Sequence, residues 1–159
     1  MELARLTAAE LEAFLDELWV PAQREMAALG VHTLQDDDTV RVEGKRHLRA
    51  RIDDERSLVC VAREEGLLGY AAAELQMPPP IFEQRQACHV NELFVRESAR
   101  RRGVGTRLLE AVEAWAADND CDRLTLTVDA DNRPARELYA AAGYGTTRET
   151  MTKPVDPAE

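Results

Sequence analysis

Hydrophobic and polar positions alternate in some stretches of the chain and recur at helical spacing in others. Residues 2–7 alternate and predict a short first strand, whereas residues 11–18 carry leucine and phenylalanine on one helix face. Pro21 is expected to interrupt this helix, and a second helical piece should run to residue 29, before Gly30. The pattern therefore predicts a strand followed by two helical pieces.

The next stretch is polar and highly charged. Residues 31–42, with an acidic run at residues 36–38, are expected to form a surface loop, and the basic residues 43–53 a short exposed helix. The acidic run could also guide a cationic amine. The arginine cluster at residues 46–51 admits a second anion site, although a solvated helix face is the simpler interpretation.

The second half of the chain alternates between strand-like and helix-like segments. Proline-rich residues 77–86 are expected to be a connection that cannot join a central sheet ladder. The order β-α-α-β-β-β-α-β-α-β predicts an α/β (α+β) fold with a mixed sheet of about six strands flanked by about four helices. The elements expected here are strands at 58–62, 67–75, 89–95, 123–129 and 144–155, and helices at 103–118 and 132–142.

Length and composition indicate one domain over residues 1–159, with no domain linker. No apolar run is long enough for a membrane span, and the first residues lack the pattern of a signal peptide, so we expect a cytoplasmic protein with no membrane partner. The net charge of −10 disfavours nucleic acid and favours a cationic substrate. The three cysteines are scattered without CxxC spacing, so no metal site is expected.

The most informative segment is a glycine-containing turn between a strand and a helix. The strand ends in Leu93, Phe94 and Val95, and the helix after the turn has an apolar stripe. The first N–H groups of a helix lack internal partners, and glycines let an anion approach them, so the turn is suited to phosphate. The alternative is an ordinary turn with solvated arginines. The residues concerned are Arg100, Arg101, Arg102, Gly103, Val104, Gly105 and Thr106.

Two common phosphate motifs do not fit this turn. A Walker A loop needs GxxxxGK followed by Ser or Thr, and a Rossmann fingerprint needs GxGxxG. Residues 100–105 instead resemble the Arg/Gln-x-x-Gly-x-Gly/Ala signature of the GNAT superfamily of N-acetyltransferases. Residues 132–144 are similar to that family's second motif, with Asn132, Ala135, Tyr139, Gly143 and Tyr144 at the matching positions.

The resemblance is close over residues 90–145 and implies a GNAT-like, mostly antiparallel sheet. It implies that the diphosphate of acetyl-CoA binds the backbone N–H groups of residues 101–106. The pantetheine arm would lie beside the strand ending in Leu93, Phe94 and Val95, where that strand separates from residues 124–128. Asn132 would contact the cofactor, and the small side chain of Ala135 would leave room for it.

Acetyl transfer to an amine needs a base, stabilisation of an oxyanion and protonation of a leaving thiolate. Tyr139 is the candidate general acid, and the alternative is a core aromatic. Glu92, a carboxylate in a strand expected to be buried, is the candidate base. The alternatives are an ion pair of Glu92 with Arg96 or Arg123, His89 as the base, or a water chain. A backbone N–H near Val95 could polarise the carbonyl.

The resemblance implies direct transfer of an acetyl group from acetyl-CoA to the primary amine of a small molecule, polyamine-like or aminoglycoside-like. A protein or peptide N-terminal acetyltransferase is an alternative. A non-catalytic acyl-CoA-binding regulator is another. Relatives are commonly dimers, so a homodimer is expected.

Overall fold

A five-stranded sheet forms the centre of the protein in the computed structural model, which describes residues 1–30 and 32–157. The strand order is β1-β2-β3-β4-β5. All neighbouring pairs are antiparallel except β4 and β5, which are parallel. This confirms the mixed, mostly antiparallel sheet, with one strand fewer in the described residues than expected. The strands are β1 (Glu2–Arg5), β2 (Ser57–Arg63), β3 (Leu67–Gln76), β4 (Ala87–Val95) and β5 (Arg123–Leu126).

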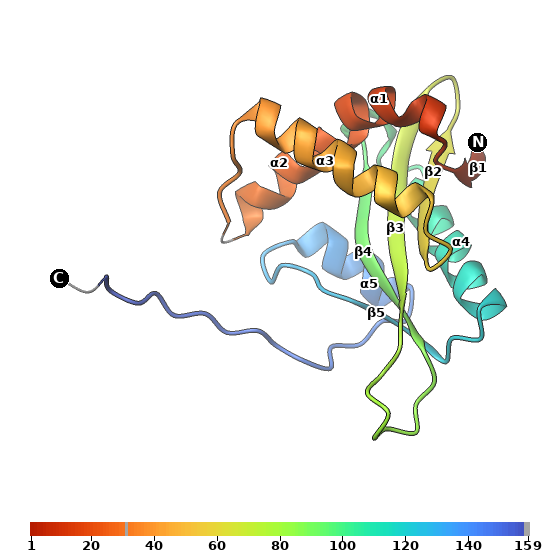
Figure 1. Cartoon of the computed structure of the whole chain (residues 1–159), viewed down its shortest axis with the longest axis vertical. Coiled ribbons are helices and arrows are strands. Elements are labelled where there is room, and N and C mark those ends of the chain that lie inside the picture. Colours follow the sequence, from red (N-terminus) through yellow and green to blue (C-terminus); the bar gives the residue numbers. More distant parts are fainter. Residues whose placement is uncertain (31, 158–159) are drawn as a thin grey trace.

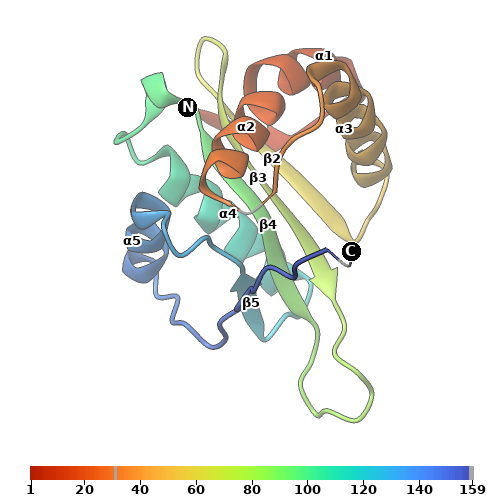
Figure 2. The same ribbon diagram turned by 90° about the vertical axis from the view of Figure 1, so that its left-hand side faces the viewer.

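Helices cover both faces of the sheet (Figures 1 and 2). One face carries α1 (Leu11–Phe14), a π-helical turn η2 (Leu15–Trp19), α2 (Val20–Leu29) and α3 (Asp37–Ile52). The other face carries α4 (Val104–Asp118), and α5 (Arg133–Ala141) lies near it beside the end of β4. Short 3₁₀ turns, η1 (Ala8–Glu10) and η3 (Glu97–Ala99), complete the set.

Side chains of the central strands alternate between two hydrophobic cores. In β2, Val59 and Val61 pack into the core beneath α1–α3, whereas Leu58 and Cys60 pack into the core beneath α4. A strand buried on both faces needs apolar residues at nearly every position, which explains the continuous apolar run of residues 58–62. Each core therefore ties one helical layer to the same sheet.

The first helical segment continues through Pro21, contrary to the expected interruption. The N–H of Val20 donates to the carbonyl of Leu15, five residues earlier, and Pro21 then occupies the first turn of α2. Proline is tolerated in a first helical turn, where its missing N–H would have no intrahelical partner in any case. The wider π-helical turn thus joins α1 to α2.

The acidic run at residues 36–38 begins a helix, so the expected loop over 31–42 was wrong from Asp36 onward; residue 31 itself lies outside the described residues. Asp36 is the N-cap of α3, and its Oδ1 accepts a 2.9 Å hydrogen bond from the N–H of Thr39. Carboxylates are favourable at a helix N-terminus because they satisfy free N–H groups and oppose the positive end of the dipole. These acids therefore start a helix.

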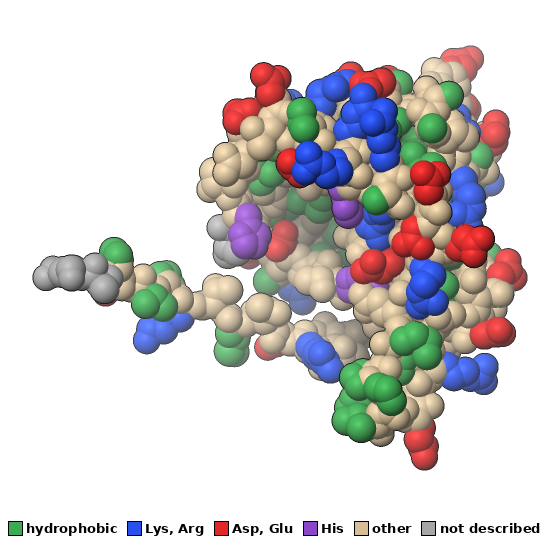
Figure 3. Space-filling model, viewed as in Figure 1, with side chains coloured by type: hydrophobic (Ala, Val, Ile, Leu, Met, Phe, Trp, Pro, Cys, Tyr) green, Lys and Arg blue, Asp and Glu red, His purple; other side chains and the backbone are tan. Residues whose placement is uncertain are grey.

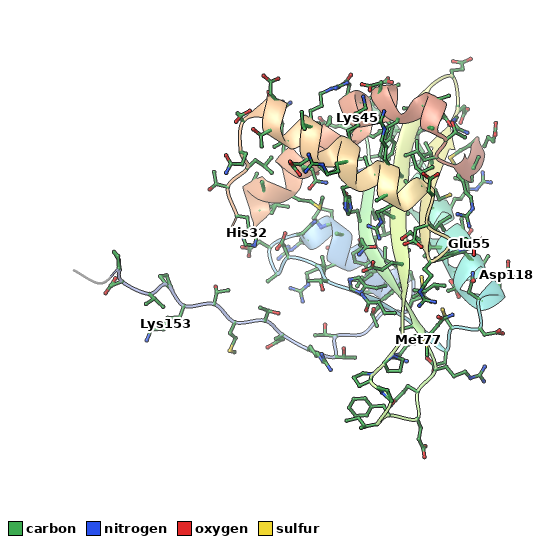
Figure 4. The ribbon with its side chains drawn as sticks, in the orientation of Figure 1. His32, Lys45, Glu55, Met77, Asp118 and Lys153 are labelled. Carbon is green, nitrogen blue, oxygen red and sulfur yellow. The ribbon has the colours of Figure 1, made fainter. Side chains whose placement is uncertain are left out.

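The basic residues that follow are only in part a solvated face. Arg46 and Arg49 of α3 are exposed, but Arg51 is buried, with 9% of its surface accessible. Lys45 forms an ion pair with Glu12 (Figure 4) and Arg41 one with Asp16, which fasten α3 to the first helical segment. Arg51, which is buried, and Lys45, which pairs with Glu12, therefore have structural roles, whereas Arg46 and Arg49 form a solvated face.

Residues 145–157 form neither helix nor strand, and they project away from the body (Figure 1), so the expected strand at 144–155 was wrong. Gly143, with φ 98°, ends α5, and the residues after Tyr144 are exposed. A strand needs a hydrogen-bonding neighbour, and the tail pairs with no strand among the described residues. β-Propensity without such a partner does not make a strand.

The proline-rich connection is a loop, as predicted. It begins at Met77, extends beyond the end of the sheet and connects β3 to its neighbour β4 (Figure 4). Met77, Ile81 and Phe82 are exposed on it.

Among the helices of residues 1–30 and 32–157, none combines the length and the apolar character that a membrane span needs.

Candidate functional site

An irregularity in β4 gives the site its shape. Glu92 pairs with Ala72 of β3 and Val90 pairs with Ala73, so Asn91 is an extra residue between two consecutive ladder positions. Such a β-bulge lets two successive side chains share one face of a sheet. Asn91 and Glu92 therefore both point to the side covered by α1–α3, since Asn91 bonds Arg51 of α3 and Glu92 bonds Gln23 of α2.

β4 separates from β5 at the same place. The ladder between the two strands ends at the pair Val90 and Leu126, and β5 does not continue beyond Leu126. Bulges increase strand twist, which accounts for divergence immediately after Asn91. Among residues 1–30 and 32–157, no strand lies beside the edge of β4 from Glu92 to Val95 on this side. The resemblance to the GNAT family implied a gap at this place, next to Leu93, Phe94 and Val95.

Glu92 is held by two hydrogen bonds on one carboxylate oxygen. Its Oε2 accepts from Nε2 of Gln23, at 2.9 Å, and from the hydroxyl of Tyr70 on β3. The ion pairs considered from the sequence do not form, because Arg96 pairs with Glu17 and Arg123 with Asp122. The carboxylate is thus oriented by neutral donors.

Tyr70 is a fully buried phenol with 0% of its surface exposed. Burial raises the pKa of Tyr70 well above its usual range, and the negative charge of Glu92 adds to the effect. A buried hydroxyl without a partner would be costly, and the bond to Glu92 supplies that partner. Tyr70 is therefore a permanent donor to the carboxylate near neutral pH.

Next to Glu92 lies a polar cluster that crosses three elements. Arg51 donates from Nη2 to Oδ1 of Asn91 at 2.7 Å, and Nδ2 of Asn91 donates to Oε1 of Glu74 at 3.2 Å. Partial burial acts to raise the pKa of Glu74, but hydrogen bonds from Asn91 and Gln76 outweigh it and lower that pKa. His89 lies on the same side, and its Nδ1 is 2.7 Å from Oγ1 of Thr125. In Figure 3 the molecule is hollowed below α2 and α3, with histidine and acidic side chains at the hollow.

The glycine-containing turn leads into α4 through two residues with positive φ, Arg101 at 62° and Gly103 at 77°. A Cβ added at Gly103 would meet nothing within 4 Å, so the backbone there is open. The first N–H groups of α4, from Val104 to Thr106, point out of the start of a 15-residue helix. This is the anion-binding geometry expected from the sequence.

Two arginines of the turn already have partners. Arg100 donates from Nε to the carbonyl of Val95 at 2.8 Å and pairs with Glu25 of α2 at 2.6 Å. Arg102 lies 3.4 Å from Glu64. Arg100 thus links the end of β4 to α2.

The second motif forms α5, and its residues have clear structural positions. Asn132 is the N-cap, with Oδ1 accepting from the N–H of Ala135 at 3.3 Å. Leu138 faces Gly105, where an added Cβ would lie 3.2 Å from its Cδ2. Gly105 therefore permits close packing of α5 on α4, a role different from the close ligand approach expected of it.

Tyr139 is half-buried on α5, and its ring packs edge-on against Tyr144 at 5.7 Å between centroids. Burial raises its pKa above the usual value of 10.0. The hydroxyl has no hydrogen-bond partner among the described side chains, which leaves it available to a ligand.

A cavity of about 280 Å³ lies between α2 and α3. Gln23, which holds Glu92, forms part of its wall, together with Trp19, Val40 and Glu43. A larger hollow of about 420 Å³ lies elsewhere, beside Arg5 and Trp115, and none of the candidate residues lines it. The cavity next to Gln23 is the one with a connection to the candidate base.

The model of the acetyltransferase (GNAT) family matches residues 12–144. The chain belongs to this family. The match includes the bulged strand, the turn before α4 and the second motif on α5. The resemblance inferred from the two GNAT motifs is thereby confirmed.

Two curated GNAT relatives are similar in sequence. An uncharacterized N-acetyltransferase, YhfO, of Bacillus subtilis (strain 168) is 35% identical over 100 residues, which cover 61% of this chain and 64% of that relative. Aminoglycoside N(6')-acetyltransferase type 1 of Serratia marcescens is 29% identical over 69 residues, which cover 43% of this chain and 47% of that relative. The chain thus matches less than two thirds of the length of each relative.

Solved structures support the GNAT fold. A tetramutant of a Bacillus halodurans protein superposes with a TM-score of 0.81 at 21% identity, covering 98% of this chain and 100% of the other. A structure of AAC(6')-Iy in complex with the bisubstrate analogue CoA-S-monomethyl-acetylneamine superposes with a TM-score of 0.72 at 17% identity, covering 98% of both chains. At these identities the likeness concerns the fold.

Glu92 is a candidate from the sequence, but the residues that surround it are not. Tyr70 stands in an alanine-rich strand, Gln23 on a helix, and Arg51 in a basic run that was interpreted as solvated. The one available signal was Tyr70, a polar aromatic in an otherwise apolar strand, which needs a buried partner.

Proposed function

We propose that this chain transfers an acetyl group from acetyl-CoA directly to the primary amine of a small molecule, polyamine-like or aminoglycoside-like. The whole chain, residues 1–159, would act as a single acetyltransferase domain with its cofactor-binding core at residues 90–145. The observation that carries the proposal is Glu92, fixed beside the open edge of β4, which leads to the N-terminus of α4.

The residues at the turn and along β4 fit acetyl-CoA. The N–H groups of residues 101–106 and the open backbone at Gly103 suit a diphosphate, as helix N-termini generally do. The free edge of β4 from Leu93 through Phe94 to Val95 offers backbone groups to an extended pantetheine arm. The amide nitrogen of Asn132 is left for the cofactor, since its oxygen caps α5. When bound, acetyl-CoA supplies an activated thioester.

Three groups of the chain would perform the chemistry. Glu92 would accept a proton from the incoming amine, by itself or through water; His89, on the same side, is the weaker candidate because Thr125 occupies its Nδ1. A backbone N–H near Val95 would stabilise negative charge on the carbonyl oxygen. Tyr139 would protonate the leaving thiolate, because burial keeps its phenol protonated.

A small acceptor is favoured by the cavity between α2 and α3. Glu43 and Gln23 in its wall suit a cationic or hydroxylated molecule. The related aminoglycoside N(6')-acetyltransferase of Serratia marcescens also acts, by its name, on a small amine. The homodimer and the cytoplasmic location expected from the sequence stay predictions.

The test is acetyl-CoA turnover against polyamines, aminoglycosides, amino acids and short peptides, with products detected by mass spectrometry. We expect one class of small amine to be favoured over the peptides. Preference for peptides would support the N-terminal acetyltransferase alternative. Tight acetyl-CoA binding with no product from any amine would support the non-catalytic regulator, and absence of binding would overturn the cofactor assignment.

A further inference from the structure

We propose that Tyr70 and Gln23 are positioning residues that hold Glu92 in the orientation a general base needs. The inference rests on the proposed function, since it assigns a role to residues that touch neither acetyl-CoA nor the amine. It extends the site from the edge of β4 to the neighbouring strand and to α2.

Both donors act on the same oxygen of Glu92. Gln23 Nε2 lies 2.9 Å from Oε2, and the hydroxyl of Tyr70 bonds the same atom. Oε1 has no hydrogen-bond partner within residues 1–30 and 32–157. Two donors on one oxygen fix the plane of the carboxylate and leave the other oxygen to receive a proton.

Tyr70 cannot move away from this bond. Its ring is fully buried, packed edge-on against Phe14 at 4.8 Å and tilted against Phe94 at 6.3 Å between centroids. Val61 is its partner across the ladder with β2. Side chains locked by packing in this way are what a precise site requires around its reacting groups.

Gln23 connects the carboxylate to the cavity where the proposed amine would bind. It donates to Glu92 and lines the cavity between α2 and α3. By contrast, the neighbouring network of Arg51 and Glu74 holds Asn91 and makes no hydrogen bond to Glu92. The two networks on this face therefore have different tasks, and only the first orients the base.

The test is a double-mutant cycle in the full chain, using the best amine of the panel. Glu92→Gln should lower kcat by about 10²–10⁴-fold, the usual contribution of a general base. Tyr70→Phe, which removes only the hydroxyl, should lower kcat about tenfold with the KM for acetyl-CoA within about twofold. In the Glu92→Gln background, Tyr70→Phe should cost less than about twofold, because there is no base left to orient.

Gln23→Leu should show the same dependence on Glu92, with a higher KM for the amine. Val61→Ala is the matched packing control, since it weakens the core beside Tyr70 without removing a donor, and it should lower kcat equally in both backgrounds. Equal losses for Tyr70→Phe in both backgrounds would overturn the positioning role while acetyl transfer stands. A wild-type chain without turnover would overturn the proposed function itself.

Discussion

A Cβ atom placed on Gly105 would lie 3.2 Å from Cδ2 of Leu138, so the first turn of α4 and the middle of α5 meet more closely than an ordinary van der Waals contact with a methyl group allows. The same atom would lie 3.8 Å from Cγ2 of Val95. The turn proposed to bind the diphosphate, the helix that carries Tyr139 and the end of β4 are therefore packed at one point.

Gly105→Ala should consequently weaken acetyl-CoA binding. The added methyl requires Cδ2 of Leu138 to move by a few tenths of an ångström, which shifts α5 against the turn. The higher helix propensity of alanine, about 1 kcal/mol over glycine, offsets this strain in the stability of the fold. We expect a several-fold higher Kd for acetyl-CoA with little change in melting temperature. Gly145→Ala is the control, because an added Cβ there meets nothing within 4 Å. If both variants bind acetyl-CoA like the wild type, the contact has no bearing on the site.

Arg51→Met should destabilise the fold. The side chain of Arg51 is only 10% exposed, and the change removes its hydrogen bond to Asn91, whereas Glu74 is 38% exposed and stays solvated. Leaving a part-buried acceptor without its donor costs about 1–3 kcal/mol. Urea denaturation would measure the loss, with Arg49→Met on the exposed side of α3 as the control. A loss no greater than that of Arg49→Met would mean that Arg51 is effectively solvated.

Tyr139→Phe should lower kcat by about 10²-fold or more and leave the Kd for acetyl-CoA nearly unchanged. The reason is that the phenol, kept protonated by burial, is the proposed donor to the thiolate. Since the pKa of Tyr139 lies above 10.0, no fall in activity below that pH should come from its ionisation. Turnover that survives the change would exclude Tyr139 as the general acid. Pre-steady-state kinetics would then distinguish chemistry from product release.

Stability should fall at alkaline pH. Burial raises the pKa of Tyr70 and Tyr139, of Tyr144 to about 12 and of the Cys88 thiol to about 12. The folded chain therefore keeps protons that the unfolded chain releases near the ordinary values of 9.0 for thiols and 10.0 for phenols. The free energy of unfolding is fully retained below pH 9 and decreases as the pH rises toward about 12.

Urea denaturation at a series of pH values from 7 to about 11 would measure this decrease. Tyr144→Phe should make it shallower, because one of the responsible groups is gone. An unfolding free energy that stays constant up to pH 11 would contradict the assignment of these buried groups.

Most of the fold could be predicted because both cores leave a simple signature in the sequence. The apolar run at 58–62 predicts a strand, the apolar stripe of α4 predicts a helix packed on the sheet, and the glycines mark the turn between β4 and α4. The secondary-structure predictions fail where the conformation of a segment depends on contacts with other residues. Asp36 starts a helix through a hydrogen bond to Thr39, and the tail after Tyr144 stays extended for want of a neighbouring strand.

Some residues of the candidate site could likewise be proposed from the sequence, and others could not. Glu92 is a candidate from the sequence because a carboxylate stands out in an apolar strand, and Tyr139 is one because it matches the second motif of the family. Tyr70 and Gln23 lie 22 and 69 positions from Glu92 in the chain, so no local pattern relates them to it. The bulge was also invisible, because Asn91 reads as an ordinary strand residue until its neighbours across the ladder are known.

Asn91 also determines how a one-residue deletion would act on this protein. Because it is the unpaired residue of β4, its removal would leave Glu92 opposite Ala72 and Val90 opposite Ala73, and no other side chain would change sides. Loss of Glu92 instead would also remove the bulge, but it would put Asn91 opposite Ala72 and leave the strand without its carboxylate. The divergence of β4 from β5 begins beside this one inserted residue, and β5 itself ends at Leu126. A chain without Asn91 would therefore keep both hydrophobic layers and show how far the bulge alone opens this edge.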